Sequence, residues 1–251
     1  MAYTRRDFIR TVGLGVAAAP LTAAFTPVLT GDRETVKELL QRKTPNTWLF
    51  TGDSITHGAK HTHGCRSYPE VFAERIRWEL ARVRDVVINT GISGNTTQHI
   101  LNDFEWRVAR YSPSAVSLMI GTNDCAKPEL PPAVFRKNLE QLVKKIRETG
   151  AVPLLHTPNI IIVTGAPERR RLPEYIPVIR EVAAAEGVLL IDHYKYWESR
   201  PQETVFKNWL NDPLHPNAEG HREMARLLFR ELEIFDASAP TCGAPYYEGA
   251  H

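Results

Sequence analysis

Short apolar runs alternate with longer amphipathic stretches along almost the whole chain, and this alternation limits the folds that the chain can adopt. Apolar runs rich in Val, Ile and Leu are typical of strands buried on both faces, whereas apolar residues three or four positions apart are typical of helices. Strands that alternate with helices predict a parallel sheet covered by helices. The expected strands cover residues 47–51, 86–89, 115–120, 152–156 and 188–191.

The stretches between these runs carry the helical pattern. Gly150 and Gly187 each follow one of them, at the position where helices commonly end on a left-handed residue, so we expect sharp helix ends there. From Asp236 onward proline and glycine are frequent, which predicts an irregular tail. The expected helices cover residues 32–42, 68–83, 97–110, 132–149, 173–186 and 218–232.

The first residues form a separate region. Arg5 and Arg6 precede an apolar stretch, residues 12–21, that is too short to span a bilayer, and small residues follow up to Ala24. This order resembles a twin-arginine export signal. The resemblance implies a signal peptide over residues 1–24, cleavage after Ala24, and export to the periplasm or the cell exterior without stable membrane insertion. A basic amphipathic helix or a retained membrane anchor is the alternative.

The rest of the chain, residues 25–251, has no internal repeat, linker or change of composition, so we expect a single domain. The formal net charge of the whole chain is +2, and without Asp7 and the three leader arginines (Arg5, Arg6 and Arg10) it is zero. A chain without excess positive charge gives no reason to expect nucleic acid as a partner.

The three cysteines allow at most one disulfide bond within the chain. Cys65 and Cys125 both fall in loops near the expected site segments, so a bond between them is one interpretation. Three free thiols, with Cys242 as the third, are the interpretation that we prefer slightly. No Cys-x-x-Cys spacing indicates a zinc site.

Four polar segments lie at or after the ends of expected strands, where parallel sheets bind their ligands. The first, residues 52–56, is Gly-Asp-Ser-Ile-Thr, in which Ser54 follows a glycine that permits a tight turn. A serine hydroxyl needs a base before it can attack a substrate. The segment lacks the Gly-x-Ser-x-Gly pattern of α/β-hydrolases, and by itself it could be a simple turn or a helix N-cap.

The second and third segments offer hydrogen-bond donors. Residues 89–96 form a glycine-bearing loop that opens an expected helix and exposes backbone N–H groups to an anion. Residues 121–124 are Gly-Thr-Asn-Asp, which places the side-chain amide of Asn123 at the end of a strand. An amide at this position can donate to a developing oxyanion.

The fourth segment, residues 211–221, contains Asp212 and His215 in a turn braced by prolines. At this spacing the carboxylate can reach the imidazole, fix its tautomer and stabilise the imidazolium ion. His221 follows at helical spacing, and we expect it to cap or pack.

In this order, the four segments resemble those of the SGNH/GDSL hydrolase family over nearly the whole of the mature chain. The resemblance implies a flavodoxin-like three-layer α/β/α sandwich with a five-stranded parallel sheet. It also implies that Ser54 is the nucleophile, His215 its base and Asp212 the acid that orients the base. The backbone N–H groups of Ser54 and Gly94 and the side-chain amide of Asn123 would form the oxyanion hole. No metal and no organic cofactor are expected.

Several histidines lie near these segments. The spacing of His57, His61 and His63 could in principle bind a metal, but no carboxylate or cysteine in the sequence completes the set convincingly. We therefore expect a polar loop or the rim of the site, with His57 as a candidate for substrate contact. His156 and His193 lie at strand ends and are expected to be structural.

Other residues near the segments have two interpretations each. Asp53 and Asp124 are expected to brace loops through backbone N–H groups, and Asp53 is also a weak candidate for substrate binding. Trp197 and Trp209 precede the Asp-His turn, where Trp209 could stack on a sugar, although core packing explains it equally well. The three arginines at residues 169–171 form either a solvated loop or a contact to an anionic substrate.

The family resemblance includes acetylesterases, lysophospholipases, thioesterases and acyltransferases, so it does not choose the substrate. The expected export, the lack of a long apolar lid segment and the histidine-rich loop favour a short acyl group on a glycan. We therefore predict a carbohydrate O-acetylesterase that works through an acyl-serine intermediate. The alternatives are a lysophospholipase or thioesterase for longer acyl chains, and an exported glycan-binding protein without turnover.

Overall fold

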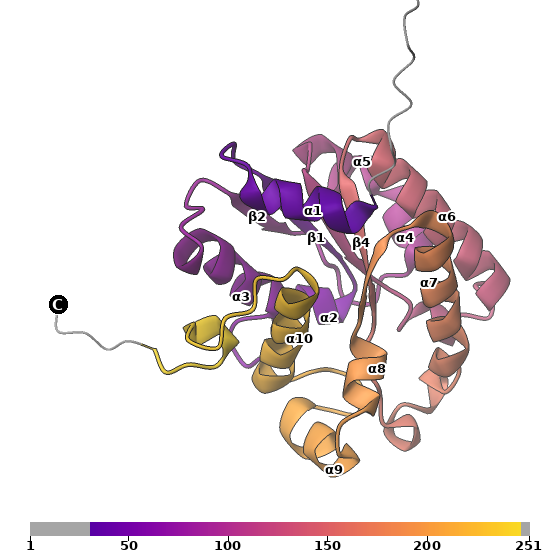
Figure 1. The fold of residues 1–251 in the computed structure, drawn as a ribbon. Helices are drawn as coiled ribbons and strands as arrows, with labels where there is room; N and C mark the ends of the chain where they lie inside the picture. Colours follow the sequence, from indigo (N-terminus) through magenta and orange to yellow (C-terminus); the bar gives the residue numbers. More distant parts are fainter. Residues whose placement is uncertain (1–30, 247–251) are drawn as a thin grey trace, which may run out of the picture.

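The computed structural model describes residues 31–246 and contains a five-stranded sheet in which all neighbouring strands are parallel. The strand order is β2-β1-β3-β4-β5, the order of flavodoxin-like folds (Figure 1). All predicted strands are confirmed, and no strand end moves by more than one residue. The strands are β1 Thr47–Gly52, β2 Val86–Asn89, β3 Ala115–Met119, β4 Val152–Thr157 and β5 Leu189–Asp192.

Helices cover both faces of this sheet and complete a three-layer α/β/α sandwich (Figure 1). One face carries α1 Asp32–Gln41, α3 Tyr68–Glu74 and α10 Ala218–Glu231, and the other carries α4 Thr97–Asn102, α6 Pro132–Glu148 and α7 Leu172–Glu186. Successive side chains of a strand point to opposite faces. Trp48 and Phe50 of β1 therefore pack with the first set of helices, whereas Leu49 between them packs with the second.

The helix predicted over residues 97–110 is interrupted after α4. At Asp103 the backbone leaves the helical region (φ −101°, ψ 13°), and a short helix, α5 Phe104–Arg107, follows. The Arg107 side chain is completely buried and donates hydrogen bonds to backbone carbonyl groups at the ends of β1 and β2. Because the helix breaks here, the Arg107 side chain points to the ends of β1 and β2, which a continuous helical pattern does not predict.

The helix predicted over residues 68–83 is shorter than expected. After α3 the chain continues into a π-helical turn, Arg75–Glu79, and Ala81 then adopts a left-handed conformation with φ 55°. Helical periodicity also missed three helices that are each shorter than two turns, because so few residues do not form a recognisable pattern. They are α2 Ser54–His57, α8 His193–Glu198 and α9 Gln202–Thr204.

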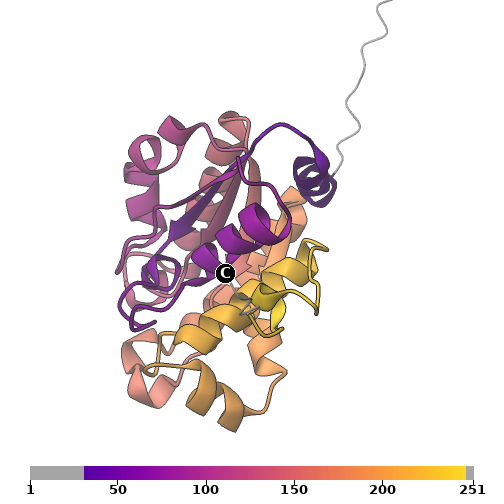
Figure 2. The ribbon, with the colours of Figure 1, turned by 90° about the vertical axis from the view of Figure 1, so that its left-hand side faces the viewer.

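The predicted helix ends and the irregular tail are confirmed. Gly187 ends α7 with φ 65°, and Gly150 follows α6 with φ 82°. Beyond Asp236 the described tail contains only a 3₁₀ turn, Pro240–Cys242. Figure 2 shows this tail beside α10 and α3.

Several predictions concern the chain as a whole. Cys65 is an exposed free thiol, and Cys125 and Cys242 are buried free thiols, so the Cys65–Cys125 bond does not form in this structure. Among residues 31–246, no helix is both long enough and apolar enough to cross a membrane. The predicted signal peptide, residues 1–24, lies outside the described residues.

Candidate active site

The carboxyl ends of the parallel strands meet at one edge of the sheet, and Ser54 lies at this edge directly after β1. A Cβ atom added at Gly52 would lie 2.2 Å from the carbonyl oxygen of Met119 and 2.4 Å from Thr56 Oγ1. Only glycine fits so close an approach. The glycine therefore allows β1, β3 and α2 to come together, with Ser54 as the first residue of α2.

Ser54, His215 and Asp212 form a chain of hydrogen bonds. Ser54 Oγ lies 2.9 Å from His215 Nε2, and His215 Nδ1 lies 2.9 Å from Asp212 Oδ2 and 3.0 Å from Oδ1. Because an ionised carboxylate only accepts hydrogen bonds, the proton of the neutral ring is on Nδ1, and Nε2 accepts from the serine hydroxyl. This arrangement can remove the hydroxyl proton of Ser54.

A tight turn fixes Asp212 and His215 relative to each other. Asp212 Oδ1 accepts hydrogen bonds from the backbone N–H of Leu214 at 2.9 Å and of His215 at 2.8 Å. The backbone N–H of Asn211 donates to the carbonyl oxygen of His215 at 2.8 Å and closes the turn. The geometry expected from the Asp-x-x-His spacing is thus built from local backbone contacts.

The surroundings of the pair favour a charged acid and a neutral base. Burial alone would raise the pKa of Asp212, but the hydrogen bonds from His215 and Leu214 outweigh burial, and the pKa is lowered. Burial lowers the pKa of His215, and the Asp212 carboxylate opposes this effect only in part. A neutral imidazole is the form that a general base requires.

Two of the three predicted oxyanion donors, Gly94 and Asn123, lie close together. The backbone N–H groups of Ser54 and Gly94 have no hydrogen-bond partner within residues 31–246. Asn123 follows β3, and its Nδ2 donates to the carbonyl oxygen of Asn95 at 3.1 Å. The structure therefore places the Asn123 amide beside the loop that carries Gly94.

Arg169 fixes the orientation of the Asn123 amide. Its Nη2 donates to Asn123 Oδ1 at 3.0 Å, and since a guanidinium group has no acceptor, Oδ1 must face the arginine. The Arg169 side chain is 20% exposed, so it is neither fully solvated nor fully buried. Nothing in the sequence distinguishes Arg169 from Arg170 and Arg171.

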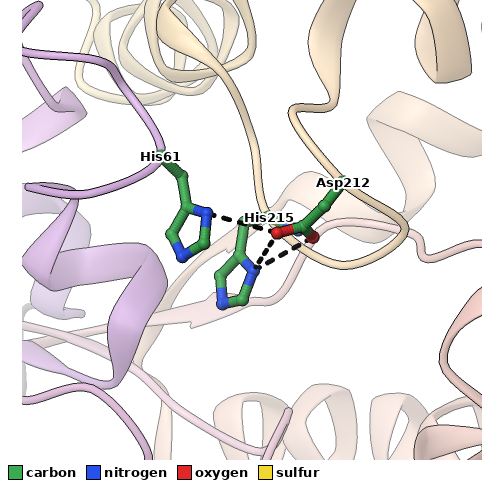
Figure 3. A group of neighbouring side chains, drawn as sticks. All are labelled: His61, Asp212 and His215. Atoms are coloured by element: carbon green, nitrogen blue, oxygen red, sulfur yellow. Dashed lines mark hydrogen bonds and ion pairs between the residues drawn. The ribbon is translucent and has the colours of Figure 1, made fainter.

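His61, from the loop after α2, lies against His215 and Asp212 (Figure 3). The two imidazole rings are stacked with centroids 3.6 Å apart and an angle of 5° between their planes. His61 Nδ1 lies 3.2 Å from Asp212 Oδ2. The sequence predicted a polar loop or the rim of the site here, and the structure places His61 in contact with both members of the Asp-His pair.

These three side chains offer ligand atoms within 4.8 Å of one another, as a metal site would. An imidazole nitrogen binds a metal along its lone pair, which lies in the plane of the ring. Because the rings of His61 and His215 are parallel and 3.6 Å apart, a single ion cannot lie in both planes.

Asp53 and Asp124 are completely buried next to the site segments. Each braces a loop as expected: Asp53 Oδ1 accepts from the N–H of Ile55 at 2.9 Å, and Asp124 Oδ1 accepts from the N–H of Thr97 at 2.9 Å. Burial raises the pKa of Asp53 to about 7 and that of Asp124 to about 6. The Asp53 side chain does not reach the surface, so the structure gives no support to the weaker prediction that it contacts substrate.

Of the other candidates for substrate contact, His57 is exposed and Trp209 is not. His57 Nδ1 lies 3.1 Å from Ser93 Oγ, beside the second segment. Trp209 is only 9% exposed and packs against Tyr196 and Trp197 in the core. Core packing, the alternative interpretation, therefore describes both tryptophans in this structure.

His156, His193 and His221 are completely buried, as expected for structural histidines. His156 Nδ1 lies 3.0 Å from His193 Nε2, and the backbone N–H of Tyr68 donates to His221 Nδ1 at 3.2 Å. Burial lowers the pKa of all three histidines, to about 3 for His193 and His221. They are neutral residues of the interior and not part of the hydrogen-bonded chain at Ser54.

Arg107 joins the loops around the site, and sequence reasoning missed it. Its guanidinium donates to Asn95 Oδ1 at 2.5 Å, to the carbonyl oxygen of Gly52 at 3.0 Å and to that of Thr90 at 2.9 Å. In the sequence it is one charged residue in a helical pattern, with no sign of burial.

Comparison with known proteins finds relatives over most of the chain. The model of the GDSL-like Lipase/Acylhydrolase family matches residues 50–223. An acetylxylan esterase of Geobacillus stearothermophilus is 28% identical over 203 residues, which are 73% of this chain and 92% of that protein. The thioesterase 1/protease 1/lysophospholipase L1 of Escherichia coli is 23% identical over 190 residues, 75% of this chain and 84% of that protein.

Some relatives are much longer than this chain. The match covers 13% of an uncharacterized protein of Mycoplasma pneumoniae and 34% of an acetylxylan esterase of Xylanibacter ruminicola. Among solved structures, the lipase/acylhydrolase of Enterococcus faecalis has a TM-score of 0.63 and 30% identity, over 75% of this chain and 95% of that chain. The family match, residues 50–223, thus includes all four site segments.

Proposed function

Because the chain belongs to the GDSL-like lipase/acylhydrolase family, it is a carboxylic ester hydrolase, and we propose that it removes short acyl groups, in particular O-acetyl groups, from a carbohydrate. The observation that carries the serine mechanism is the chain of hydrogen bonds from Ser54 Oγ through His215 to Asp212. The acetylxylan esterases among the relatives support the carbohydrate substrate.

Acylation uses this chain of hydrogen bonds directly. His215 Nε2 takes the proton of Ser54 Oγ while the oxygen forms a bond to the ester carbonyl carbon. The negative charge moves to the carbonyl oxygen, where the N–H groups of Ser54 and Gly94 and the Asn123 amide would bind it. The bond to the alcohol oxygen then breaks, and Nε2 returns the proton to the departing alcohol. Asp212 stabilises the imidazolium ion that exists between the two proton transfers.

Deacylation repeats the sequence with water. His215 takes a proton from water as the oxygen adds to the acyl carbon, the same donors bind the oxyanion, and the bond to Ser54 Oγ breaks. The serine oxygen recovers its proton from His215, and the carboxylic acid leaves. Both half-reactions begin with a neutral His215, in agreement with its lowered pKa.

A series of p-nitrophenyl esters tests this proposal. We expect the protein without residues 1–24 to hydrolyse acetate faster than butyrate and octanoate, and Ser54→Ala to lower kcat by roughly 10⁴-fold or more. Ser93→Ala is the matched control, because this serine lies beside the site but outside the hydrogen-bonded chain, and it should keep most of the activity.

The other outcomes distinguish the alternatives. Octanoate cleaved far faster than acetate would support a lysophospholipase or thioesterase, as the name of the Escherichia coli relative suggests. If wild type and Ser54→Ala were equally inactive on every ester, a glycan-binding protein without turnover would explain the chain better, and binding to acetylated xylo-oligosaccharides should be measured.

We also propose that residues 1–24 direct export through the twin-arginine route and that residues 25–251 form one catalytic domain. The paired Arg5 and Arg6 before an apolar stretch support this proposal. Replacing both arginines with lysine should keep the protein in the cytoplasm of a bacterial host, as measured by cell fractionation. Unchanged export of that variant would show that another route is used.

A further inference from the structure

We propose that His61 is a positioning residue of the ester hydrolase site: it is held by the turn that carries Asp212 and His215, stacks on the His215 ring, and keeps the base in its working orientation. This inference rests on the proposed serine mechanism. The sequence does not separate His61 from His57 and His63, so the proposal comes from the contacts that the fold creates.

The contact with the Asp-His turn is the first argument. Asn211, which precedes Asp212 in this turn, places its Nδ2 3.2 Å from His61 Nδ1. Because an amide nitrogen only donates, Nδ1 of neutral His61 accepts this hydrogen bond, and the ring proton is on Nε2. His61 Nδ1 also lies 3.2 Å from Asp212 Oδ2. The His61 ring is therefore held against the same turn that carries the base.

The stacked ring is the second argument. The His61 ring lies parallel to His215, with centroids 3.6 Å apart, and only 13% of the His61 side chain and 16% of the His215 side chain are exposed. A ring in van der Waals contact keeps water from one face of the base and hinders rotation about its χ2 bond. Rotation of the His215 ring would move Nε2 away from Ser54 Oγ, so the contact keeps the base directed at the nucleophile.

The charge of His61 matters as well. When His215 becomes an imidazolium ion, a neutral ring on its face attracts the cation, whereas a protonated His61 would place two like charges against each other. Burial, followed by the charge on His215, lowers the pKa of His61, which favours the neutral form. The titratable and charged groups around the two rings are Asp212, Lys60, His63, Arg169 and His221.

His63 provides a matched control within the same loop. Its Nε2 lies 2.6 Å from Asn211 Oδ1, so it also anchors the loop to the turn that carries the Asp-His pair. Within residues 31–246, however, it has no hydrogen bond to Asp212 and no ring contact with His215. Replacing His63 therefore removes only a contact that anchors the loop. Replacing His61 also removes the ring that stacks on His215 and lies next to Asp212.

The experiment compares three substitutions at His61 with His63→Ala, each in the otherwise unchanged protein. His61→Phe keeps a ring against His215 without the Nδ1 acceptor, His61→Asn keeps a side-chain acceptor for Asn211 without the ring, and His61→Ala keeps neither. For p-nitrophenyl acetate we expect kcat to fall roughly tenfold in His61→Ala and about threefold in each of the other two, with KM changed less than about twofold. His63→Ala should retain kcat within about twofold.

Two further readouts separate positioning from a purely structural role. Without His61 the base is better hydrated, so the pKa of His215 should rise, and the acid limb of the kcat/KM profile should move to higher pH in His61→Ala and less in His61→Phe. In proton NMR at low temperature, the downfield signal of His215 Nδ1–H should be present in wild type and His63→Ala, and broadened in His61→Ala.

Specific results would overturn the proposal. Equal losses of kcat in His61→Ala and His63→Ala, or an unchanged pH profile and an unchanged NMR signal in all three His61 variants, would show that His61 does not position the base. If the protein showed no Ser54-dependent hydrolysis, the proposed function would fail instead. The NMR signal would still test His61 in that case, because it requires no turnover.

Discussion

At Asn123, one hydrogen bond decides which atom of the amide is available to the substrate. Arg169 donates to Oδ1 at 3.0 Å, while Nδ2 donates to the Asn95 carbonyl at 3.1 Å. Without the guanidinium group the amide could turn over and present its oxygen to the developing oxyanion, which would repel it. One oxyanion-hole donor contributes roughly 10²–10³ in kcat, so we expect Arg169→Met, which keeps the aliphatic stem, to lower kcat about tenfold with little change in KM.

The measurement is steady-state hydrolysis of p-nitrophenyl acetate, with Arg170→Met as the control, because Arg170 is exposed and next in the chain. A neutral ester is used so that attraction of an anionic substrate does not contribute. If Arg169→Met left kcat unchanged and raised KM only for anionic esters, the arginine would bind substrate, as one interpretation of the sequence suggested, and would not orient Asn123.

How far the site could be predicted differs between residues. The spacing of Asp212 and His215 already brings the carboxylate to the imidazole, whereas Ser54 was paired with them by the order of the four segments. The structure places all three within hydrogen-bond distance. His61 and Arg169 reach the site from loops whose course depends on the whole fold, so their types and spacing carried no signal. Their contacts had to be found in three dimensions.

Among the connections between elements, the link from β1 to α2 tolerates the least change. A Cβ atom at Gly52 would lie 2.2 Å from a backbone carbonyl oxygen, that of Met119, which cannot move without displacing β3. We expect Gly52→Ala to lower the free energy of unfolding by roughly 3 kcal/mol, or to prevent folding. Urea denaturation measures this effect.

Gly31→Ala is the control for this substitution, because a Cβ atom there meets nothing within 4 Å. As the N-cap residue of α1, it should cost less than about 1 kcal/mol. If the free energy of unfolding fell by similar amounts in the two variants, the effect would come from the loss of a glycine in general and not from the close approach of β1 to β3.

The elements that the sequence predicted well are those in which burial of one or both faces sets the spacing of the apolar residues. The strands are nearly continuous apolar runs, and α6, α7 and α10 are long enough to show helical spacing. The predicted helix over residues 97–110 failed because Arg107 is buried by hydrogen bonds to two strand ends and a loop, a tertiary cause that local periodicity does not contain. Short helices such as α2 were not predicted, because they have too few residues to show a helical pattern.

For the molecule as a whole, the polar interior determines how stability depends on pH. His193 and His221 have pKa values lowered by burial to about 3, from an ordinary value of 6.5. The stability that depends on their neutral form is fully present above pH 6.5 and is lost as pH falls toward 3. Asp53 and Asp124 act in the opposite direction: their pKa values are raised to about 7 and about 6, so the stability from their protonated forms is lost as pH rises through those values.

Because these contributions oppose each other, the pH dependence of the wild type alone does not isolate the histidines, and a substitution is needed. His221→Asn is suitable, since the asparagine Oδ1 can accept the hydrogen bond that the backbone N–H of Tyr68 donates to His221 Nδ1, yet it takes up no proton. Between pH 6.5 and about 3 the wild type must keep His221 neutral, at about 1.4 kcal/mol for each pH unit below 6.5, and the variant need not.

We therefore expect His221→Asn to be less stable than wild type at pH 7, because a buried ring is lost, and the difference to shrink by about 1.4 kcal/mol per pH unit during acidification. Urea denaturation at a series of pH values measures the difference. The free energy of unfolding of His57→Asn, in which an exposed histidine is replaced, should change with pH as that of wild type does. If the free energy of unfolding of His221→Asn also changed with pH as that of wild type does, proton uptake at His221 would not contribute to acid unfolding. The loss of stability in acid would then have to come from His156 and His193, whose rings hydrogen-bond to each other in the same core.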